Sequence, residues 1–421
     1  MEVAATTSRA AVGRRQDLDL IRMVIVGGLI AFHTACIFVP GQFPVINQPT
    51  NFGMMAVVFF AKLWGMPLLF MVAGAGVWHS LRQRTPGVFT QERLRRLLPP
   101  LVVGIVVLLP PQVYFLLLGR GHDPGPYWQF LDRFLDLRLA LGFPMFVRGA
   151  APDGLFELGH LWFLYYLLLY SLLLLPVFLF LRRRLNHGRL EWLADRCQPP
   201  LGVVLLALPV VLVEVTLGIV GPGSWHSYVH AIFLLYGFLI AADHRLDEAI
   251  SRNWRPALLI GVAALPGLFV ITVYDLGGAD RLLGTDYHPW SLAFRLLKAT
   301  AGTAWGIAVL GFVSSRIRRP QESEVPAARH RVMRYANQAV LPFYVLHQTP
   351  IVIIGVYVAQ WRVGILPKYM TIGLASLAAT MLIYDLGIRR TRITRVLFGM
   401  PPADSLEPYD ASGRPVAGDR W

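Results

Sequence analysis

Arginine and histidine side chains in one apolar run of this sequence could do chemistry. Arg22 and His33 stand at the second and last positions of IRMVIVGGLIAFH, eleven residues apart. Eleven residues make about three turns of an α-helix, so both side chains share one face, about 16 Å apart along the axis. An ionisable residue inside a membrane span is a functional-site hypothesis, and histidine is a natural general base near neutral pH. A structural histidine, hydrogen-bonded to a neighbouring helix, is an equal alternative for His33.

A basic pair lies in the segment ERLRRLLPPL, which begins at Glu92. Arg93 and Arg96 are three positions apart, so they share one face of a helix. Guanidinium groups bind phosphate through directed, bidentate hydrogen bonds, and the pair therefore fits a phosphate or pyrophosphate group. The alternative is an ordinary basic flank at the cytoplasmic end of a span, which composition alone favours.

Two further histidines lie in apolar segments, close to other residues that could form part of a site. His160 follows Glu157 in ELGHLWFLYYLL, at the start of a span, where both side chains could face a polar acceptor. His347 lies near the middle of the span that contains NQAVLPFYVLHQTP, between Pro342 and Pro350. Prolines interrupt the helical hydrogen bonds, and such interruptions in membranes usually lie beside a cavity. An aromatic belt around His160 and interhelical hydrogen bonding for His347 are the alternatives.

Glu214, Arg295, Lys298 and Asp385 also lie inside apolar runs. Charged groups within a bilayer usually pair with one another or with backbone carbonyls. We expect most of these four residues to have structural partners of this kind.

The composition indicates a membrane environment for all of these residues. Of the 421 residues, 55% are hydrophobic and only 15% are charged, against about 25% charged in soluble proteins. The mean hydropathy is +0.52. A spanning helix needs about 20 apolar residues. We predict an all-α, polytopic bundle of ten transmembrane helices, at 20–39, 52–77, 97–118, 158–181, 200–220, 226–242, 257–275, 291–313, 337–360 and 368–388.

The distribution of lysine and arginine predicts the orientation of this bundle. With the N-terminus inside, the predicted cytoplasmic segments hold 28 Lys and Arg residues and the external segments hold 6. Basic loops stay on the cytoplasmic side, so we expect both termini to be cytoplasmic. The formal net charge of +14 is then explained by orientation and by contact with anionic lipid, and we expect no nucleic-acid partner.

The segments outside the spans have their own predicted roles. The longest external segment, 119–157, contains YWQFLDRFLDLRLALGF, which could form a helix in the membrane interface or a surface helix of the loop. We divide the chain into a cytoplasmic segment at 1–15, a membrane domain at 16–398 and a disordered cytoplasmic tail at 399–421.

Motifs of several enzyme classes are absent from the sequence. There is no P-loop, dinucleotide fingerprint, zinc-protease helix or nucleophile elbow. The two cysteines, Cys36 and Cys197, form neither a zinc pattern nor a disulfide framework. The sequence therefore disfavours ATP-driven transport and redox chemistry, and we expect no bound metal.

Five segments, in order, resemble the membrane acyltransferase family 3, and within it the branch of the glucans biosynthesis protein C type, a periplasmic glucan acyltransferase. They are DLDLIRMVIVGGLIAFH, RLRR, GHLWFLYYLL, NQAVLPFYVLHQTPI and IYDLGIRRTRITRVLFG. The resemblance extends over about residues 15–398 and includes the expected ten-helix topology.

The resemblance implies transfer of an acyl group, of the acetyl or succinyl class, from a cytoplasmic acyl-CoA-type donor to a hydroxyl of an extracytoplasmic carbohydrate. Arg22 and His33 match the family's Arg-x10-His pattern, which is needed for activity. Arg93 and Arg96 match its Arg-x2-Arg pair. Some members of the family carry an additional extracytoplasmic esterase-like domain. For the present chain, we expect any second step of that kind to be carried out by a separate envelope protein.

These observations together predict a multi-pass O-acyltransferase of the inner (cytoplasmic) membrane. Acyl-CoA is the expected co-substrate, a carbohydrate or other envelope acceptor is the second substrate, and no cofactor is expected to stay bound. The alternatives are a transporter or flippase with no covalent chemistry and a non-catalytic subunit of an envelope assembly. The expected site residues are His33 and Arg22 for catalysis, Arg93 and Arg96 for donor binding, and Glu157, His160 and His347 on the acceptor side.

Overall fold

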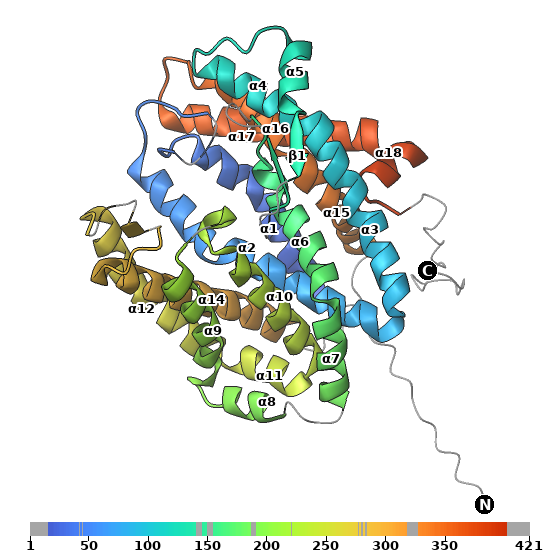
Figure 1. The fold of residues 1–421 in the computed structure, drawn as a ribbon, viewed down its shortest axis with the longest axis vertical. Helices are drawn as coiled ribbons and strands as arrows, with labels where there is room; N and C mark the ends of the chain where they lie inside the picture. The colour runs from blue at the N-terminus through green and yellow to red at the C-terminus, as the bar shows by residue number, and fades with distance from the viewer. Residues whose placement is uncertain are drawn as a thin grey trace, which may run out of the picture.

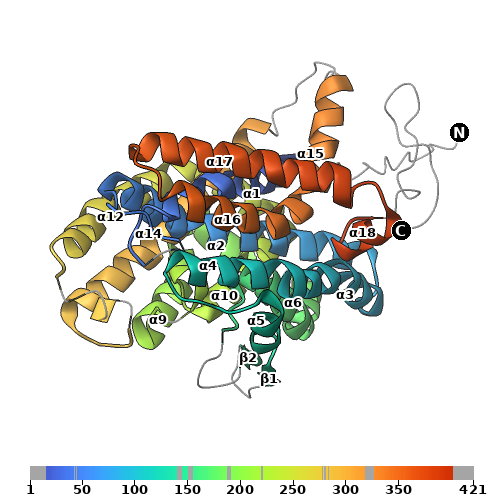
Figure 2. The same cartoon turned by 90° about the horizontal axis from the view of Figure 1, so that it is seen from above.

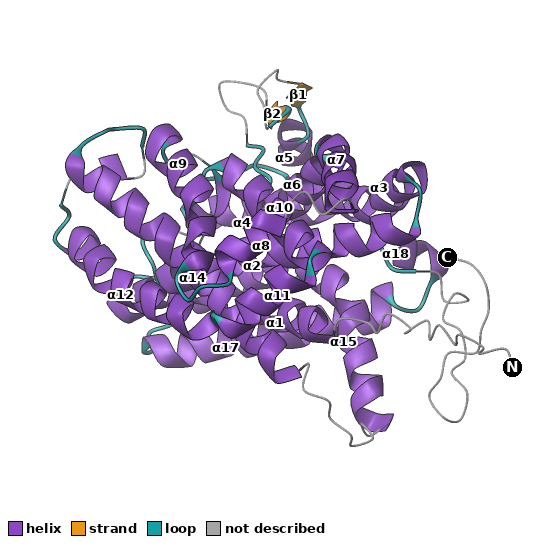
Figure 3. Ribbon diagram, turned by 90° about the horizontal axis from the view of Figure 1, so that it is seen from below, coloured by secondary structure: helices purple, strands orange, loops and turns teal. Residues whose placement is uncertain are grey.

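The computed structural model of the chain describes residues 16–139 except 42 and 44, then 145–149, 155–186, 191–219, 221–317 except 277, 279, 280 and 283, and 327–401. Helices make up most of this part (Figures 1 and 3). In chain order they are α1 (Gln16–Cys36), α2 (Phe52–Gln83), α3 (Pro86–Val103), α4 (Leu109–Gly119), α5 (Tyr127–Phe134), α6 (Trp162–Leu173), α7 (Leu175–Asn186), α8 (Glu191–Cys197), α9 (Ala207–Leu217), α10 (Ser227–Ala242), α11 (His244–Arg252), α12 (Trp254–Val273), α14 (Pro289–Ile317), α15 (Ala327–Leu346), α16 (Gln348–Val358), α17 (Ile365–Leu382) and α18 (Arg392–Leu397).

Six helical stretches are individually long and apolar enough to cross a membrane. Three bent pairs raise the number of candidate spans in the described residues to as many as nine. A shorter apolar helix, Gly202–Leu217, occupies the fifth of the ten predicted runs. The all-α membrane bundle is thus confirmed, while the number of ten spans and the cytoplasmic placement of the termini stay predictions. The six stretches are Gln16–Cys36, Phe52–Gln83, Pro86–Gly119, Trp254–Val273, Pro289–Ile317 and Ile365–Ile388.

Proline accounts for two of the bends. The axis turns by 58° between α6 and α7 and by 53° between α15 and α16. Pro176 and Pro350 stand at the starts of α7 and α16. Each lacks a backbone N–H and crowds the carbonyl four residues earlier, which interrupts the helix there. The third bend, 106° between α10 and α11, occurs at Asp243, whose side chain caps α11 by accepting from Arg245 N–H at 2.9 Å.

Two π-helical turns continue long spans rather than end them. Gly104–Leu108 joins α3 to α4, and Ile383–Ile388 extends α17. The first makes one helical stretch, Pro86–Gly119, which begins eleven residues before the predicted span at 97–118. The predicted run missed its polar first turns, in which Thr85 caps the helix by accepting from Val88 N–H.

Small residues allow α2 and α10 to cross at close range. A Cβ atom on Gly74 of α2 would overlap the backbone carbonyl of Leu234, and one on Gly237 of α10 would overlap that of Met71. Interfaces between membrane helices are enriched in small residues for this reason, because packing replaces the hydrophobic effect as the source of stability. Met71 and Leu234 at this crossing belong to the larger of two buried apolar clusters.

The outer surfaces of the helices are apolar. Leu259 of α12 is 69% exposed and Leu212 of α9 is 64% exposed. Leu374 of α17 is likewise exposed, on a helix that runs along α16 and α1 (Figure 2). In water such apolar surfaces would promote aggregation, whereas lipid acyl chains cover them.

The segments outside the bundle lie at opposite edges in Figure 1, with α5 at the upper edge and α8 beside α11 at the lower edge. The predicted helix of the 119–157 segment is confirmed only in its first half. It ends at Phe134, and the following residues form the two-stranded antiparallel sheet of β1 (Leu137–Leu139) and β2 (Val147–Gly149). Phe130 and Phe134 of α5 are buried, and Trp128 is 75% exposed.

Candidate active site

The histidine of the first span lies against aromatic neighbours. His33 is near the end of α1, its ring centre 4.9 Å from that of Phe32 and 5.6 Å from that of Phe43. The residue is half-buried. Its Nδ1 is fully buried and has no hydrogen-bond partner among the described residues. A buried imidazole nitrogen without a partner is uncommon in proteins, and His33 shares this feature with His160 and His347.

The structure brings His33 together with two other predicted site residues. The ring centre of His347 is 5.2 Å from that of His33 and 5.2 Å from that of His160. His160 and His347 are buried. We call His33, His347 and His160 the histidine cluster. Its members come from the first, fourth and ninth predicted spans, so only the folded bundle assembles it.

His347 occupies the break between α15 and α16. Its Nδ1 lies 2.7 Å from the carbonyl oxygen of Tyr344 and 3.2 Å from that of Phe343. The ring also stacks on Phe343 with an interplanar angle of 5°. Its Nε2 is buried and has no partner in the described part of the chain. The orientation of the His347 ring is therefore fixed by contacts with residues that are its neighbours in the sequence.

The same segment holds His160. Nε2 of His160 lies 3.0 Å from the carbonyl oxygen of Val345, and the Tyr344 hydroxyl donates to the carbonyl of His160. His160 stands in a 3₁₀ turn, Gly159–Leu161, just before α6. Residues 343–347 thus position two of the three histidines.

Arg22 forms hydrogen bonds within the bundle, at the opposite end of α1 from His33. Its Nη2 donates to Asp19 Oδ1 at 3.0 Å and to Asn337 Oδ1 of α15 at 2.9 Å. A guanidinium held by two acceptors on different helices has a fixed direction. Arg22 therefore does not join the histidine cluster, which lies about three helical turns further along α1.

Arg93 and Arg96 lie on α3 at the same end of the bundle as Arg22. Arg96 is exposed and close enough to Arg22 for their charges to interact. The guanidinium carbon of Arg93 lies 5.1 Å from the ring centre of Phe89. We call Arg22, Arg93 and Arg96 the arginine cluster. The structure thus separates the predicted site residues into two groups.

Glu157 joins neither group. The residue is exposed, and it makes no hydrogen bond or ion pair with any residue that the structure describes. Its predicted place on the acceptor side stays a prediction.

Three residues near these clusters were not singled out from the sequence. Asn337 accepts from Arg22, and Tyr344 contacts both His160 and His347. Lys62 of α2 is close enough to His33 for their charges to interact. Two signals pointed to them. Tyr344 precedes His347 by three positions and so shares its helix face, and Lys62 is a charge inside an apolar run.

The other ionisable residues of the spans have partners, as expected. Lys298 donates to Glu214 at 2.8 Å, and Arg295 donates to the carbonyls of Arg281 and Gly284. Asp385 accepts from the hydroxyl of Tyr335 at 2.9 Å. These contacts confirm a structural role for the four residues predicted to be paired.

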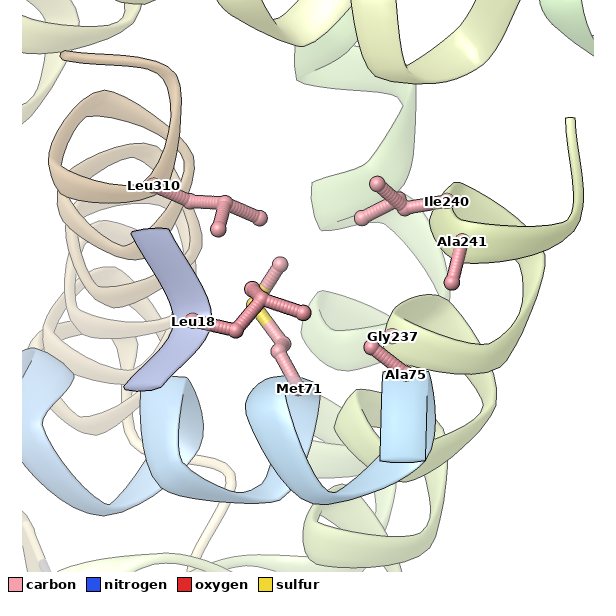
Figure 4. Close-up of a pocket in the computed structure, with 7 residues that line it drawn as sticks. All are labelled: Leu18, Met71, Ala75, Gly237, Ile240, Ala241 and Leu310. Atoms are coloured by element: carbon pink, nitrogen blue, oxygen red, sulfur yellow. The ribbon is translucent and has the colours of Figure 1, made fainter. Parts of the chain in front are cut away.

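A small pocket between α1, α2, α10 and α14 belongs to neither cluster (Figure 4). Its lining is apolar and its volume is about 10 Å³, about the minimum for one water molecule. The lining residues are Leu18, Met71, Ala75, Gly237, Ile240, Ala241 and Leu310. A pocket of this size and polarity holds no acyl donor or sugar.

The described residues include no group of three or more His, Cys, Asp or Glu side chains that could hold a metal ion. The long helices with apolar outer faces define the class of the chain, a polytopic membrane protein. Residues 15–385 match the acyltransferase domain of acyltransferase family 3. The chain belongs to this family and is a membrane acyltransferase. Neither a curated protein nor a solved structure matched the chain.

Proposed function

We propose that this acyltransferase moves an acyl group of the acetyl or succinyl class from a cytoplasmic acyl-CoA donor to a hydroxyl group outside the cytoplasm. The acceptor is a carbohydrate or another component of the envelope, and the resemblance to the glucans biosynthesis protein C branch favours a glucan. The membrane in question is the inner membrane, and residues 16–398 form the catalytic domain.

The observation that carries this proposal is the separation of the two clusters along α1, which contributes Arg22 to one cluster and His33 to the other. The arginine cluster suits the phosphates of the donor, because guanidinium groups bind phosphate with directed hydrogen bonds. His33 stands about 16 Å further along α1. Acyl-CoA has a flexible arm between its phosphates and its thioester, and that arm spans such a gap.

In the proposed reaction His33 acts as the general base. The acceptor hydroxyl gives its proton to His33 Nε2, and its oxygen forms a bond to the acyl carbon. The carbon–sulfur bond of the thioester breaks, and the leaving thiolate takes the proton from His33. The reaction needs no metal or bound cofactor, because one base and a good leaving group suffice for acyl transfer.

The remaining predicted residues have places in this scheme. His160 and His347 support His33 from the acceptor side, and Glu157 meets the acceptor near the external surface. A periplasmic or other envelope protein that binds the product or supplies the acceptor is a further expected partner.

The test uses full-length protein purified in lipid nanodiscs, with acetyl-CoA or succinyl-CoA as donor and a glucan oligosaccharide as acceptor. Release of free thiol and the mass of the oligosaccharide are followed together. We expect His33→Ala to lower turnover by about 10²–10⁴-fold, and Arg96→Ala to raise KM for the donor. Arg95→Ala is the matched control, since Arg95 is an exposed arginine between Arg93 and Arg96 that points about 160° away from Arg93 and about 100° away from Arg96.

Turnover by His33→Ala equal to the wild type would refute the role of His33. Equal effects of Arg95→Ala and Arg96→Ala on KM would refute a directed donor site and leave only a general effect of positive charge.

A further inference from the structure

We propose that His347 is a positioning residue for His33, with its Nε2 accepting a hydrogen bond from His33 Nδ1–H. This inference rests on the proposed role of His33 as general base. It gives His33 the partner that every base of this kind needs, a group that holds the ring in one tautomer and one direction.

The backbone fixes the tautomer of His347. Its Nδ1 faces the carbonyl oxygens of Tyr344 and Phe343 at 2.7 and 3.2 Å. Carbonyl oxygens only accept hydrogen bonds, so Nδ1 must carry the proton. The neutral ring then has its lone pair on Nε2, which makes Nε2 an acceptor. That nitrogen is buried and has no partner among the described residues.

The complementary group is the buried Nδ1 of His33, which likewise lacks a partner in the described part of the chain. The two ring centres are 5.2 Å apart. An in-line N–H···N bond of about 2.9 Å between two imidazoles places their centres about 5 Å apart. The interplanar angle is 38°, and the bond forms when rotation of the His33 side chain points Nδ1 at His347 Nε2. Leaving either buried nitrogen unpaired is unfavourable.

The other titratable groups around the pair do not supply this acceptor. Lys62 of α2 interacts with His33 through its charge, but an ammonium group only donates. His160 touches the ring of His347, and its Nε2 faces the carbonyl of Val345. Its buried Nδ1 also lacks a partner among the described residues, but the ring of His160 makes no contact with that of His33, whereas the rings of His33 and His347 are 5.2 Å apart. The Tyr344 hydroxyl donates to the carbonyl of His160, and Cys36, on α1 itself, offers only a weak sulfur acceptor.

A neutral acceptor suits the site inside a membrane. A carboxylate in this position would have to be desolvated, which is costly in a medium of low polarity. A neutral imidazole with a fixed lone pair orients His33 without that cost. During acyl transfer Nδ1–H of His33 stays in place and donates to His347, while Nε2 takes the hydroxyl proton and passes it to the leaving thiolate.

The experiment compares His347→Phe with His347→Gln in the nanodisc assay with acetyl-CoA or succinyl-CoA and a glucan oligosaccharide. Phenylalanine keeps the ring shape but removes the acceptor. Glutamine has an NH₂ group for the backbone carbonyls and an oxygen for His33. We expect His347→Phe to lower kcat by about 10²-fold or more, with KM within about threefold of the wild type. His347→Gln should recover at least about tenfold of that loss, because it restores the acceptor.

Two further variants separate positioning from structure. In a His33→Ala background, His347→Phe should cause no further loss, because residues that act as a unit are not additive. His230→Phe is the matched control. His230 is also fully buried, bonds through Nε2 to a backbone carbonyl, that of Pro222 at 3.2 Å, and has a buried Nδ1 without a partner in the described residues. His230 lies outside the histidine cluster, and we expect the kcat of His230→Phe to stay within about threefold of the wild type.

A kcat for His347→Phe within threefold of the wild type would overturn the inference, and so would an equal loss in the Phe and Gln variants. If His347→Phe fails to fold, His347→Asn gives the same test, since its shorter amide still reaches the backbone carbonyls but not His33. Wild-type turnover by His33→Ala would instead refute the proposed role of His33 as general base, on which this inference rests.

Discussion

The buried ion pair between Lys298 of α14 and Glu214 of α9 gives a quantitative test of the fold. The two charged groups are 2.8 Å apart, with side chains 4% and 0% exposed. The Lys298 ammonium also lies 3.6 Å from the ring centre of Trp225, and Glu214 accepts from the backbone N–H of His226 at 2.7 Å. Lys298→Met removes the cation and leaves a buried carboxylate with one remaining hydrogen bond.

We expect Lys298→Met to lower the free energy of unfolding by about 3–5 kcal/mol, the usual cost of breaking a buried pair from one side. This corresponds to a factor of about 10²–10⁴ in the folding equilibrium. Adding Glu214→Gln should recover about 2 kcal/mol or more, because no charge then stays buried. The measurement is unfolding of the purified protein by SDS in mixed micelles, followed by tryptophan fluorescence.

The exposed pair Arg281–Asp286, at 3.7 Å with side chains 62% and 40% exposed, is the control. Asp286→Asn should change the unfolding free energy by no more than about 1 kcal/mol. The reasoning fails if Lys298→Met costs no more than Asp286→Asn, or if Glu214→Gln and Lys298→Met are additive.

Three other predictions concern separate parts of the molecule. Gly237→Leu should prevent the close crossing of α10 and α2 at Gly74, so size-exclusion chromatography after detergent extraction should show aggregated protein. Gly387→Leu, at a position with no atoms near the added side chain, is the control and should give monodisperse protein. Asn337→Ala removes an acceptor 2.9 Å from Arg22; donor titrations should show a KM raised by a few-fold, consistent with about 1 kcal/mol for one hydrogen bond, and an unchanged kcat. Burial raises the pKa of the Cys197 thiol from 9.0 to about 11, so its thiolate fraction at pH 8 is about 100-fold lower than that of an ordinary thiol. Maleimide labelling of Cys197 should therefore be slow at pH 8, become faster as the pH rises, and be fast in the unfolded protein. Fast labelling of the native protein at pH 8 would contradict this burial.

The sequence predicted the helical bundle well because apolar runs of spanning length have few other uses. All ten predicted runs are helical in the structure, including the short fifth run at Gly202–Leu217. The bends were harder to place. Pro342 and Pro350 were noted together, but the axis turns beside Pro350, whereas Pro342 lies inside α15 without ending it. Neighbouring helices decide which proline becomes a break, and this information is not local.

The candidate site was predictable residue by residue but not in its grouping. The spacing of Arg22 and His33 showed that they share a face, since helical periodicity is a local property. No spacing rule relates His33 to His347, which are far apart in the sequence and meet only in the folded bundle. The same limit explains Glu157, which is near His160 in sequence yet is exposed, whereas His160 is buried.

The distance along the chain between His33 and His347 has a consequence for biosynthesis. The proposed base, His33, lies on the first helix to be made, and His347 directly follows α15, after most of the other helices. Domains fold in the order of synthesis, from the N-terminus onward. A nascent or interrupted chain that lacks α15 therefore carries His33 without the histidine cluster. If His33 needs the cluster, as we propose, such chains should be inert toward acyl donors.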